Sequence, residues 1–159
     1  MMKTTILRAT VLIGGLLCGA DAFAQDAAAY DLPSNLYSEA RERLAKSDYP
    51  AAEAAFRDFL AKHGTHALAG DAQYWLGEIF LEQRDYRQAA ATFADAIKTY
   101  PDSLKVVDSK YKLGVSLARL DSKQEACKAL KAAQADRGSE GKDRIRRGIA
   151  VERQRLGCR

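Results

Sequence analysis

The fold of this chain is decided by the stretch Ala72-Gln73-Tyr74-Trp75-Leu76-Gly77-Glu78-Ile79-Phe80, because its pattern returns at a fixed distance. Leu76-Gly77 reappears 37 residues later as Leu113-Gly114. The same offset relates three tyrosines, Tyr37, Tyr74 and Tyr111. It also relates three pairs of an alanine and a large apolar residue, Ala52/Phe56, Ala89/Phe93 and Ala126/Leu130. A constant period of this size is typical of repeat arrays in which each helix pair stacks on its neighbour.

The hydrophobic spacing predicts helices throughout the chain. Apolar residues recur every three to four positions, and no segment has the strict alternation of a strand. We therefore expect an all-α fold of three helix pairs and one further helix. The expected helices are about 36–46 (capped by Ser34 or Asn35), 51–62, 69–83, 87–100, 104–119, 123–135 and 141–156.

The small residues of the repeat have a predicted mechanical role. Ala40, Gly77 and Gly114 occupy equivalent positions on the first helix of each pair, where a small side chain lets the second helix approach closely. The alanines of the second helices serve the same purpose, and Phe56, Phe93 and Leu130 fill the space between neighbours.

The N-terminal residues predict export. Lys3 and Arg8 precede an apolar run over 9–20, and Ala22-Phe23-Ala24 follows it, as in a secretory signal peptide that is cleaved after Ala24. We expect a signal peptide at 1–24, a short flexible leader at 25–35 and one domain at 36–159. The run is shorter than the about 20 residues of a membrane-spanning helix, so no stable membrane anchor is expected. The alternative is a lipoprotein anchored at Cys18, which the bulky Leu17 disfavours.

Two cysteines, Cys127 and Cys158, remain after cleavage of the signal peptide. An even number in an oxidising compartment favours a disulfide, and a terminal helix that caps the array would bring the two together. The alternative is a pair of buried free thiols. Neither residue lies in a motif of a catalytic cysteine.

The charge is unevenly distributed. The whole chain has a formal net charge of +4, which does not suggest a nucleic-acid-binding protein, but residues 137–159 contain eight basic and three acidic side chains. This basic terminal helix either meets an acidic partner or an anionic envelope surface, or is an ordinary solvated face.

The repeat pattern resembles the tetratricopeptide repeat. Leu76, Gly77, Phe80, Ala89 and Phe93 stand at the positions of that motif, with Gln73 in place of its usual tryptophan. This resemblance implies a right-handed solenoid whose first helices line a concave groove.

A narrower resemblance rests on three segments, Asp48-Tyr49-Pro50-Ala51-Ala52, Ala72-Gln73-Tyr74-Trp75-Leu76-Gly77-Glu78 and Tyr100-Pro101-Asp102-Ser103. They are similar to the C-terminal domains of the Tol-Pal accessory proteins, the YbgF or CpoB family. The resemblance implies a periplasmic, non-enzymatic adaptor that binds TolA and coordinates peptidoglycan synthesis with outer-membrane constriction. Members often have an N-terminal coiled coil, for which 25–35 is too short, so the oligomeric state stays open. The alternative is another envelope scaffold, such as an outer-membrane protein assembly factor.

The tyrosine row is the candidate partner-binding surface, with charged residues beside it on the same helices. The predicted site comprises Tyr37, Arg41, Tyr74, Glu78, Tyr111 and Arg119. The alternative is that the tyrosines pack between repeats, and their periodicity fits both interpretations.

The sequence contains few candidate residues for a catalytic or metal site. His63 and His66 are the only histidines, and no carboxylate stands at a spacing that would complete a metal site. No phosphate-binding glycine loop or nucleophile motif is present. We therefore predict neither catalysis nor a cofactor nor a metal.

Overall fold

The computed structural model describes residues 32–136 and 142–158. The predicted signal peptide and most of the predicted leader lie outside these residues. The described part is entirely helical apart from its turns, as the sequence predicts. Its seven helices are α2 (Pro33–Ala45), α3 (Tyr49–His63), α4 (Ala69–Glu82), α5 (Tyr86–Thr99), α6 (Val106–Arg119), α7 (Lys123–Ala135) and α8 (Asp143–Leu156).

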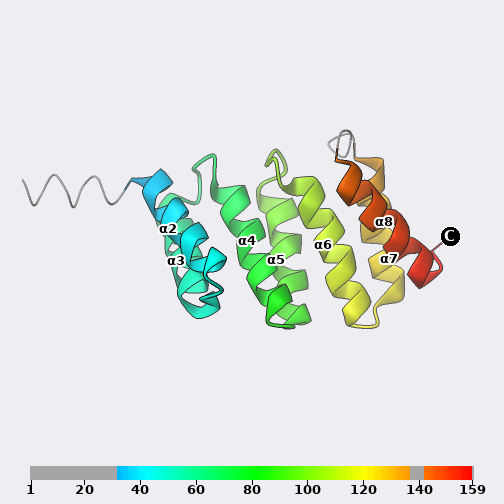
Figure 1. The fold of residues 1–159 in the computed structure, drawn as a ribbon. Coiled ribbons are helices and arrows are strands. Elements are labelled where there is room, and N and C mark those ends of the chain that lie inside the picture. The colour runs from blue at the N-terminus through cyan, green and yellow to red at the C-terminus, as the bar shows by residue number, and fades with distance from the viewer. Residues whose placement is uncertain (1–31, 137–141, 159) are drawn as a thin grey trace, which may run out of the picture. The chain divides into compact units, whose positions relative to one another are not determined.

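Each helix packs against the next one in the chain, which confirms the prediction of stacked helix pairs (Figure 1). The pairs are α2 with α3, α4 with α5, and α6 with α7. The first helices also contact one another across the pairs, α4 with α6 and α6 with α8. Since α8 begins 37 residues after α6, it takes the place of the first helix of a fourth unit.

The predicted start of the first helix is wrong. Ser34 and Asn35 do not cap it, because the helix begins at Pro33 and Leu32 is its N-cap, without a side-chain hydrogen bond. Proline is favoured at the first helical position because its fixed φ suits the helix and its missing N–H is not needed there.

The second helix begins two residues earlier than predicted. Asp48 is its N-cap, with a side-chain oxygen that accepts a hydrogen bond from the Ala51 backbone N–H. Asp85 caps α5 in the same way through the Gln88 backbone N–H. In the third pair Ser122 is the N-cap of α7 without such a bond.

The turns within the pairs share a backbone feature that their residue types do not predict. Ser47, Arg84 and Asp121, spaced by 37 residues, adopt left-handed backbone angles with φ near 60°. The next N–H in each case bonds back to a carbonyl five residues earlier, for example that of Asp85 to Phe80 at 2.8 Å. This is the Schellman pattern that ends helices, and here it starts every second helix in the same direction.

The small residues lie where the repeat predicts. A Cβ on Gly77 would stand 2.6 Å from the ring of Phe93, and one on Gly114 would stand 2.6 Å from Leu130 Cγ. Ala40 of the first pair is fully buried, as are the alanines Ala52, Ala89 and Ala126 of the second helices. The predicted close approach of the paired helices is therefore confirmed.

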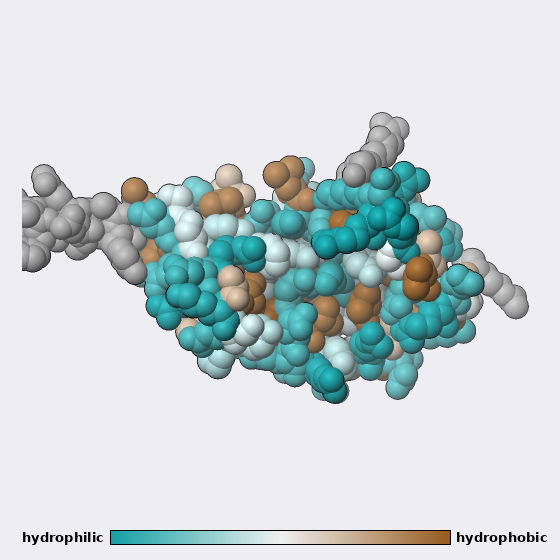
Figure 2. Space-filling model, in the orientation of Figure 1, coloured by the Kyte–Doolittle hydropathy of each residue, from teal (hydrophilic) through white to brown (hydrophobic). Residues whose placement is uncertain are grey.

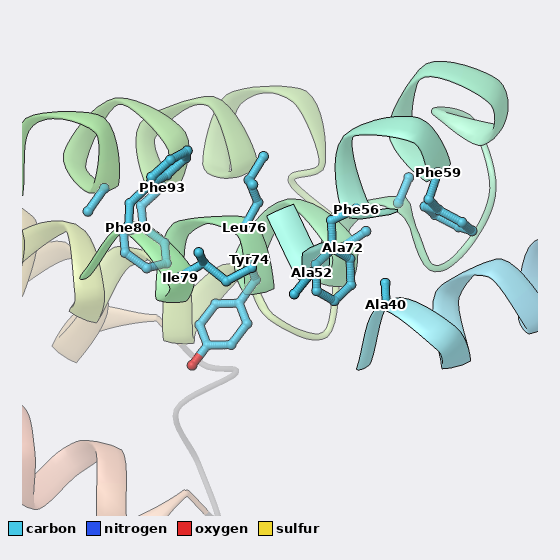
Figure 3. Packing of buried hydrophobic residues seen from close by; sticks show 12 residues of the cluster. Ala40, Ala52, Phe56, Phe59, Ala72, Tyr74, Leu76, Ile79, Phe80 and Phe93 are labelled. Atoms are coloured by element: carbon cyan, nitrogen blue, oxygen red, sulfur yellow. The ribbon is translucent and has the colours of Figure 1, made fainter. Parts of the chain in front are cut away.

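One hydrophobic core runs through the first two pairs (Figure 3). Phe56, Phe59 and Phe93 have no exposed surface. A second, smaller cluster of Leu130, Ala133 and Ile149 joins α7 to α8. Fully burying a side chain of this size stabilises a fold by roughly 1.5–3 kcal/mol, so these clusters hold the stack together.

Two serines of α6 are buried, and they differ in hydrogen bonding. Ser116 donates its hydroxyl to the Lys112 carbonyl at 2.9 Å, whereas the hydroxyl of Ser109 is buried without a partner. Ala72 stands at the repeat position of Ser109 and is fully buried. An unpartnered buried hydroxyl destabilises a fold by about 1–3 kcal/mol.

We therefore expect Ser109→Ala to raise the free energy of unfolding by about 1 kcal/mol. Urea denaturation followed by circular dichroism measures this change. Ser116→Ala is the matched control, and we expect it to give no gain, because its hydroxyl is already satisfied. If Ser109→Ala proves no more stable than Ser116→Ala, the assignment of an unsatisfied hydroxyl is contradicted.

Candidate partner-binding groove

The last helix is fixed against the array by a disulfide between Cys127 of α7 and Cys158, which follows α8. The sequence predicts this pairing, and the structure contains it. Ile149 is buried against Leu130 and Ala133 of α7. In Figure 1, α8 lies beside α6 and in front of α7. One wall of the candidate site is thus held covalently.

Tyr37 is half-buried and links two neighbouring pairs. Its hydroxyl accepts a hydrogen bond from the indole Nε1 of Trp75 at 3.0 Å, and its ring meets Phe56 and Phe59 edge to face. Burial raises the pKa of its phenol. Tyr37 therefore serves inter-repeat packing.

Tyr74 is the most buried of the three tyrosines of the row, at 6% exposure. Its ring contacts Trp75 and Phe93, and its hydroxyl points away from the core in Figure 3. Burial is the main cause that raises the pKa of this phenol, and the Glu78 carboxylate adds to it. The polar end of Tyr74 therefore faces the Glu78 carboxylate.

Tyr111 stands one repeat further and is half-buried against α8. A Cβ on Gly148 would lie 2.6 Å from the Tyr111 hydroxyl, so this glycine makes room for the phenol. Gly148 itself stands 37 residues after Tyr111, at the tyrosine position of the fourth unit. Burial, followed by the nearby Glu152 carboxylate, raises the pKa of Tyr111.

A pocket of about 500 Å³ opens between the first helices α4, α6 and α8. Tyr74 and Tyr111 form part of its lining. The complete lining is Tyr74, Trp75, Glu78, Asp108, Tyr111, Lys112, Arg144, Ile145 and Gly148. We call this hollow the groove pocket. It has the aromatic and polar lining that is usual at protein interfaces.

The structure brings part of the predicted site together. Glu78 lies in the groove pocket, where its carboxylate pairs with Lys112 Nζ at 2.8 Å. Arg41 lies on α2, with its guanidinium carbon 3.5 Å from the centre of a Trp75 ring. Arg119 is exposed at the end of α6, and its charge lowers the pKa of Glu152 on α8, secondary to the hydrogen bond from Arg155.

Six groove-lining residues were not among the predicted site residues, namely Trp75, Asp108, Lys112, Arg144, Ile145 and Gly148. Trp75 and Asp108 could have been predicted from the sequence. Asp108 stands 37 residues after Asp71, and Trp75 is next to a tyrosine of the row. Arg144 had no comparable signal, since it enters the pocket only because α8 packs beside α6 as a further first helix.

The histidines do not gather further metal ligands. His63 and His66 both lie near the ring of Phe59, and His66 Nδ1 accepts a hydrogen bond from the Leu68 backbone N–H at 3.2 Å. Within 32–136 and 142–158, no group of three or more histidine, cysteine or acidic side chains is arranged to hold a metal ion. In the same described segments, no helix has the length and hydrophobicity of a membrane span.

Comparison with protein families agrees with the helix pairs and the groove. The tetratricopeptide repeat model matches residues 37–103 and 80–140, which together cover more than half of the chain. The chain therefore belongs to the tetratricopeptide repeat family.

Among curated proteins, the chain is similar to the cell division coordinator CpoB of Pseudomonas putida, with 41% identity over 49 residues in two sequences from that species. The match covers 31% of this chain and 18% of each relative. The chain is a CpoB-like tetratricopeptide repeat protein, and the similarity to CpoB is confined to that segment.

The disulfide provides a test of how the groove pocket is held. We expect the Cys127→Ser/Cys158→Ser variant to lose about 3–4 kcal/mol of unfolding free energy, the chain-entropy value for a sequence separation of 31 residues. Denaturant titration gives this loss, and hydrogen exchange should show faster exchange of the α8 amides. Wild-type protein treated with dithiothreitol is the control and should match the variant. Unchanged stability with protected α8 amides would refute a structural role of the disulfide.

Proposed function

We propose that this protein is a periplasmic protein-binding adaptor of the Tol-Pal system, which coordinates outer-membrane constriction with peptidoglycan synthesis during cell division. The similarity to the cell division coordinator CpoB, on a tetratricopeptide repeat scaffold, is the observation that carries the proposal. In this role the protein is not an enzyme. It requires no cofactor and binds protein partners, TolA and a peptidoglycan synthase.

The disulfide supports the proposed location. Disulfides persist in oxidising compartments such as the periplasm and are rare in the cytosol. The Cys127–Cys158 pair closes the array at its last helix, where its loss would free one wall of the groove pocket. We propose that residues 1–24 are the signal peptide that delivers the chain there, with cleavage after Ala24.

The groove pocket is the proposed site of partner binding. Its lining combines the aromatic side chains Trp75 and Tyr111 with charged groups. Residues of these types contribute most of the binding energy at protein interfaces. The predicted residues Tyr74, Glu78 and Tyr111 lie in it, while Tyr37 and Arg41 border Trp75 at its side. Arg119 extends the proposed surface along α6.

A pull-down tests the function and the site together. Tagged full-length chain, expressed with its own N-terminus, is used to capture proteins from envelope extract of its host. We expect recovery of TolA or a peptidoglycan synthase. Trp75→Ala should reduce recovery by about tenfold or more, because truncating a buried interface tryptophan costs at least about 2 kcal/mol. Arg144→Glu is a second pocket variant, at an exposed side chain whose change does not disturb the core.

The control variant is Lys98→Glu, an equivalent charge reversal at an exposed position of the second helix α5. It should bind as wild type does. Equal recovery by all variants would move the site out of the groove pocket and keep the adaptor role. Recovery of outer-membrane assembly components in place of TolA would favour the alternative scaffold and reject the Tol-Pal assignment.

A further inference from the structure

The acidic side chains of the groove pocket are already neutralised. Glu78 pairs with Lys112, and Asp108 pairs with Lys142 Nζ at 2.8 Å. Asp71, just outside the pocket, accepts a hydrogen bond from the Ser103 hydroxyl at 3.1 Å. Because the Glu78 and Asp108 carboxylates are paired with lysines, they contribute little attraction for a cationic ligand, and the second oxygen of Glu78, Oε1, is buried without a hydrogen bond.

Three cations beside the same aromatic surface have no acidic partner among the described residues. Arg41 stacks on Trp75. Lys105 Nζ lies 5.3 Å and 5.5 Å from the ring centres of Tyr74 and Trp75. Arg144 lines the groove pocket, and its charge acts to lower the pKa values of Tyr74 and Tyr111 against the effect of burial.

These three cations follow the line of the first helices. Arg41 belongs to α2, Lys105 immediately precedes α6, and Arg144 belongs to α8. A cation over an aromatic face keeps free N–H donors at its edge, so it can still bind a carboxylate. Trp75 and Ile145 provide apolar surface between the charges.

The wider charge distribution points in the same direction. Residues 32–136 carry equal numbers of basic and acidic side chains, fifteen each, whereas residues 142–158 carry six basic and two acidic ones. Hydrophilic side chains make up most of the surface around α8 in the view of Figure 2. The excess positive charge therefore lies on the segment that contains α8, whose Arg144 lines the groove pocket.

We propose that the groove takes an extended acidic peptide segment of a partner protein, with its carboxylates on Arg41, Lys105 and Arg144 and its apolar side chains on Trp75 and Ile145. This inference specifies the partner chemistry of the proposed function and rests on it for the location of the site. Arginine binds carboxylates in a two-pronged geometry, which suits recognition of Asp or Glu. Arg144 lines a hollow between helices, and Arg41 and Lys105 lie against the aromatic rings beside it; a peptide can enter such a hollow, whereas a flat anionic lipid surface cannot.

The test is a peptide-display selection on the purified full-length protein with its disulfide intact. We expect the selected peptides to be enriched in Asp and Glu over the starting library. Their affinity, measured by fluorescence anisotropy, should fall about tenfold or more in the Arg41→Gln/Lys105→Gln/Arg144→Gln variant. It should fall about two- to fivefold in Arg144→Gln alone, the range of an exposed ion pair. Raising the salt concentration should weaken binding, because exposed charges are screened.

The matched control is Lys98→Gln/Lys128→Gln/Lys131→Gln, which removes three exposed positive charges from the second helices α5 and α7. It should bind the selected peptides as wild type does, apart from the loss of long-range attraction. Arg144→Gln changes only an exposed side chain, so it keeps the test decisive if the triple groove variant proves unstable.

Three results would overturn the proposal. The first is that the selected peptides show no enrichment in acidic residues. The second is that the groove variant and the control variant weaken peptide binding equally. The third is that the protein binds phosphatidylglycerol vesicles in place of peptides, in a manner that depends on the arginines. Acidic peptides bound in the groove by a protein that captures no Tol-Pal component would uphold the inference and reject the proposed function. The two failures can thus be told apart.

Discussion

The whole array depends on the contact between a large side chain of each second helix and a small residue of each first helix. A Cβ on Gly77 would stand only 2.6 Å from the Phe93 ring, and one on Gly114 only 2.6 Å from Leu130 Cγ. Paired helices come close only where one of them presents almost no side chain. This short distance between paired helices determines how the next pair stacks. It thereby determines the spacing of the first helices that form the groove pocket.

The sequence contained enough information for the architecture. The offset of 37 residues identified every helix pair, because the small and aromatic residues that form the contact are the ones that recur. Helix ends were less predictable. Leu32 and Pro33, and not the polar Ser34, define the start of α2, since a proline can begin a helix without a side-chain cap.

The left-handed turns within the pairs could not be predicted from their residue types. Left-handed residues at helix ends are usually glycine or asparagine, but here they are Ser47, Arg84 and Asp121. Their residue types give no common signal, although their spacing does. The surrounding helix pair imposes the backbone angle, which is a tertiary effect that local sequence patterns do not contain.

The candidate site was predictable in two tyrosines of the row and in Glu78, which lie in the groove pocket. The tyrosine row appears in the sequence as a periodic feature, but periodicity alone did not separate groove surface from packing. The structure assigns both roles to the row, because Tyr37 bonds Trp75 while Tyr74 and Tyr111 line the groove pocket. Lys105 lies near Tyr74 and Trp75 because α6 packs on α4, and Arg144 enters the groove pocket because α8 packs on α6, so sequence spacing alone did not predict their positions.

A double-mutant cycle at Gly77 and Phe93 tests the central claim most directly. Gly77→Ala should lower the free energy of unfolding by about 1–3 kcal/mol, because the added methyl group meets the Phe93 ring. In the Phe93→Ala background the same change should stabilise the protein by up to about 1 kcal/mol, the helix-propensity gain of alanine over glycine. Equal sucrose in all four samples keeps the weakest variant folded. A stabilising Gly77→Ala in the otherwise wild-type protein would contradict the account.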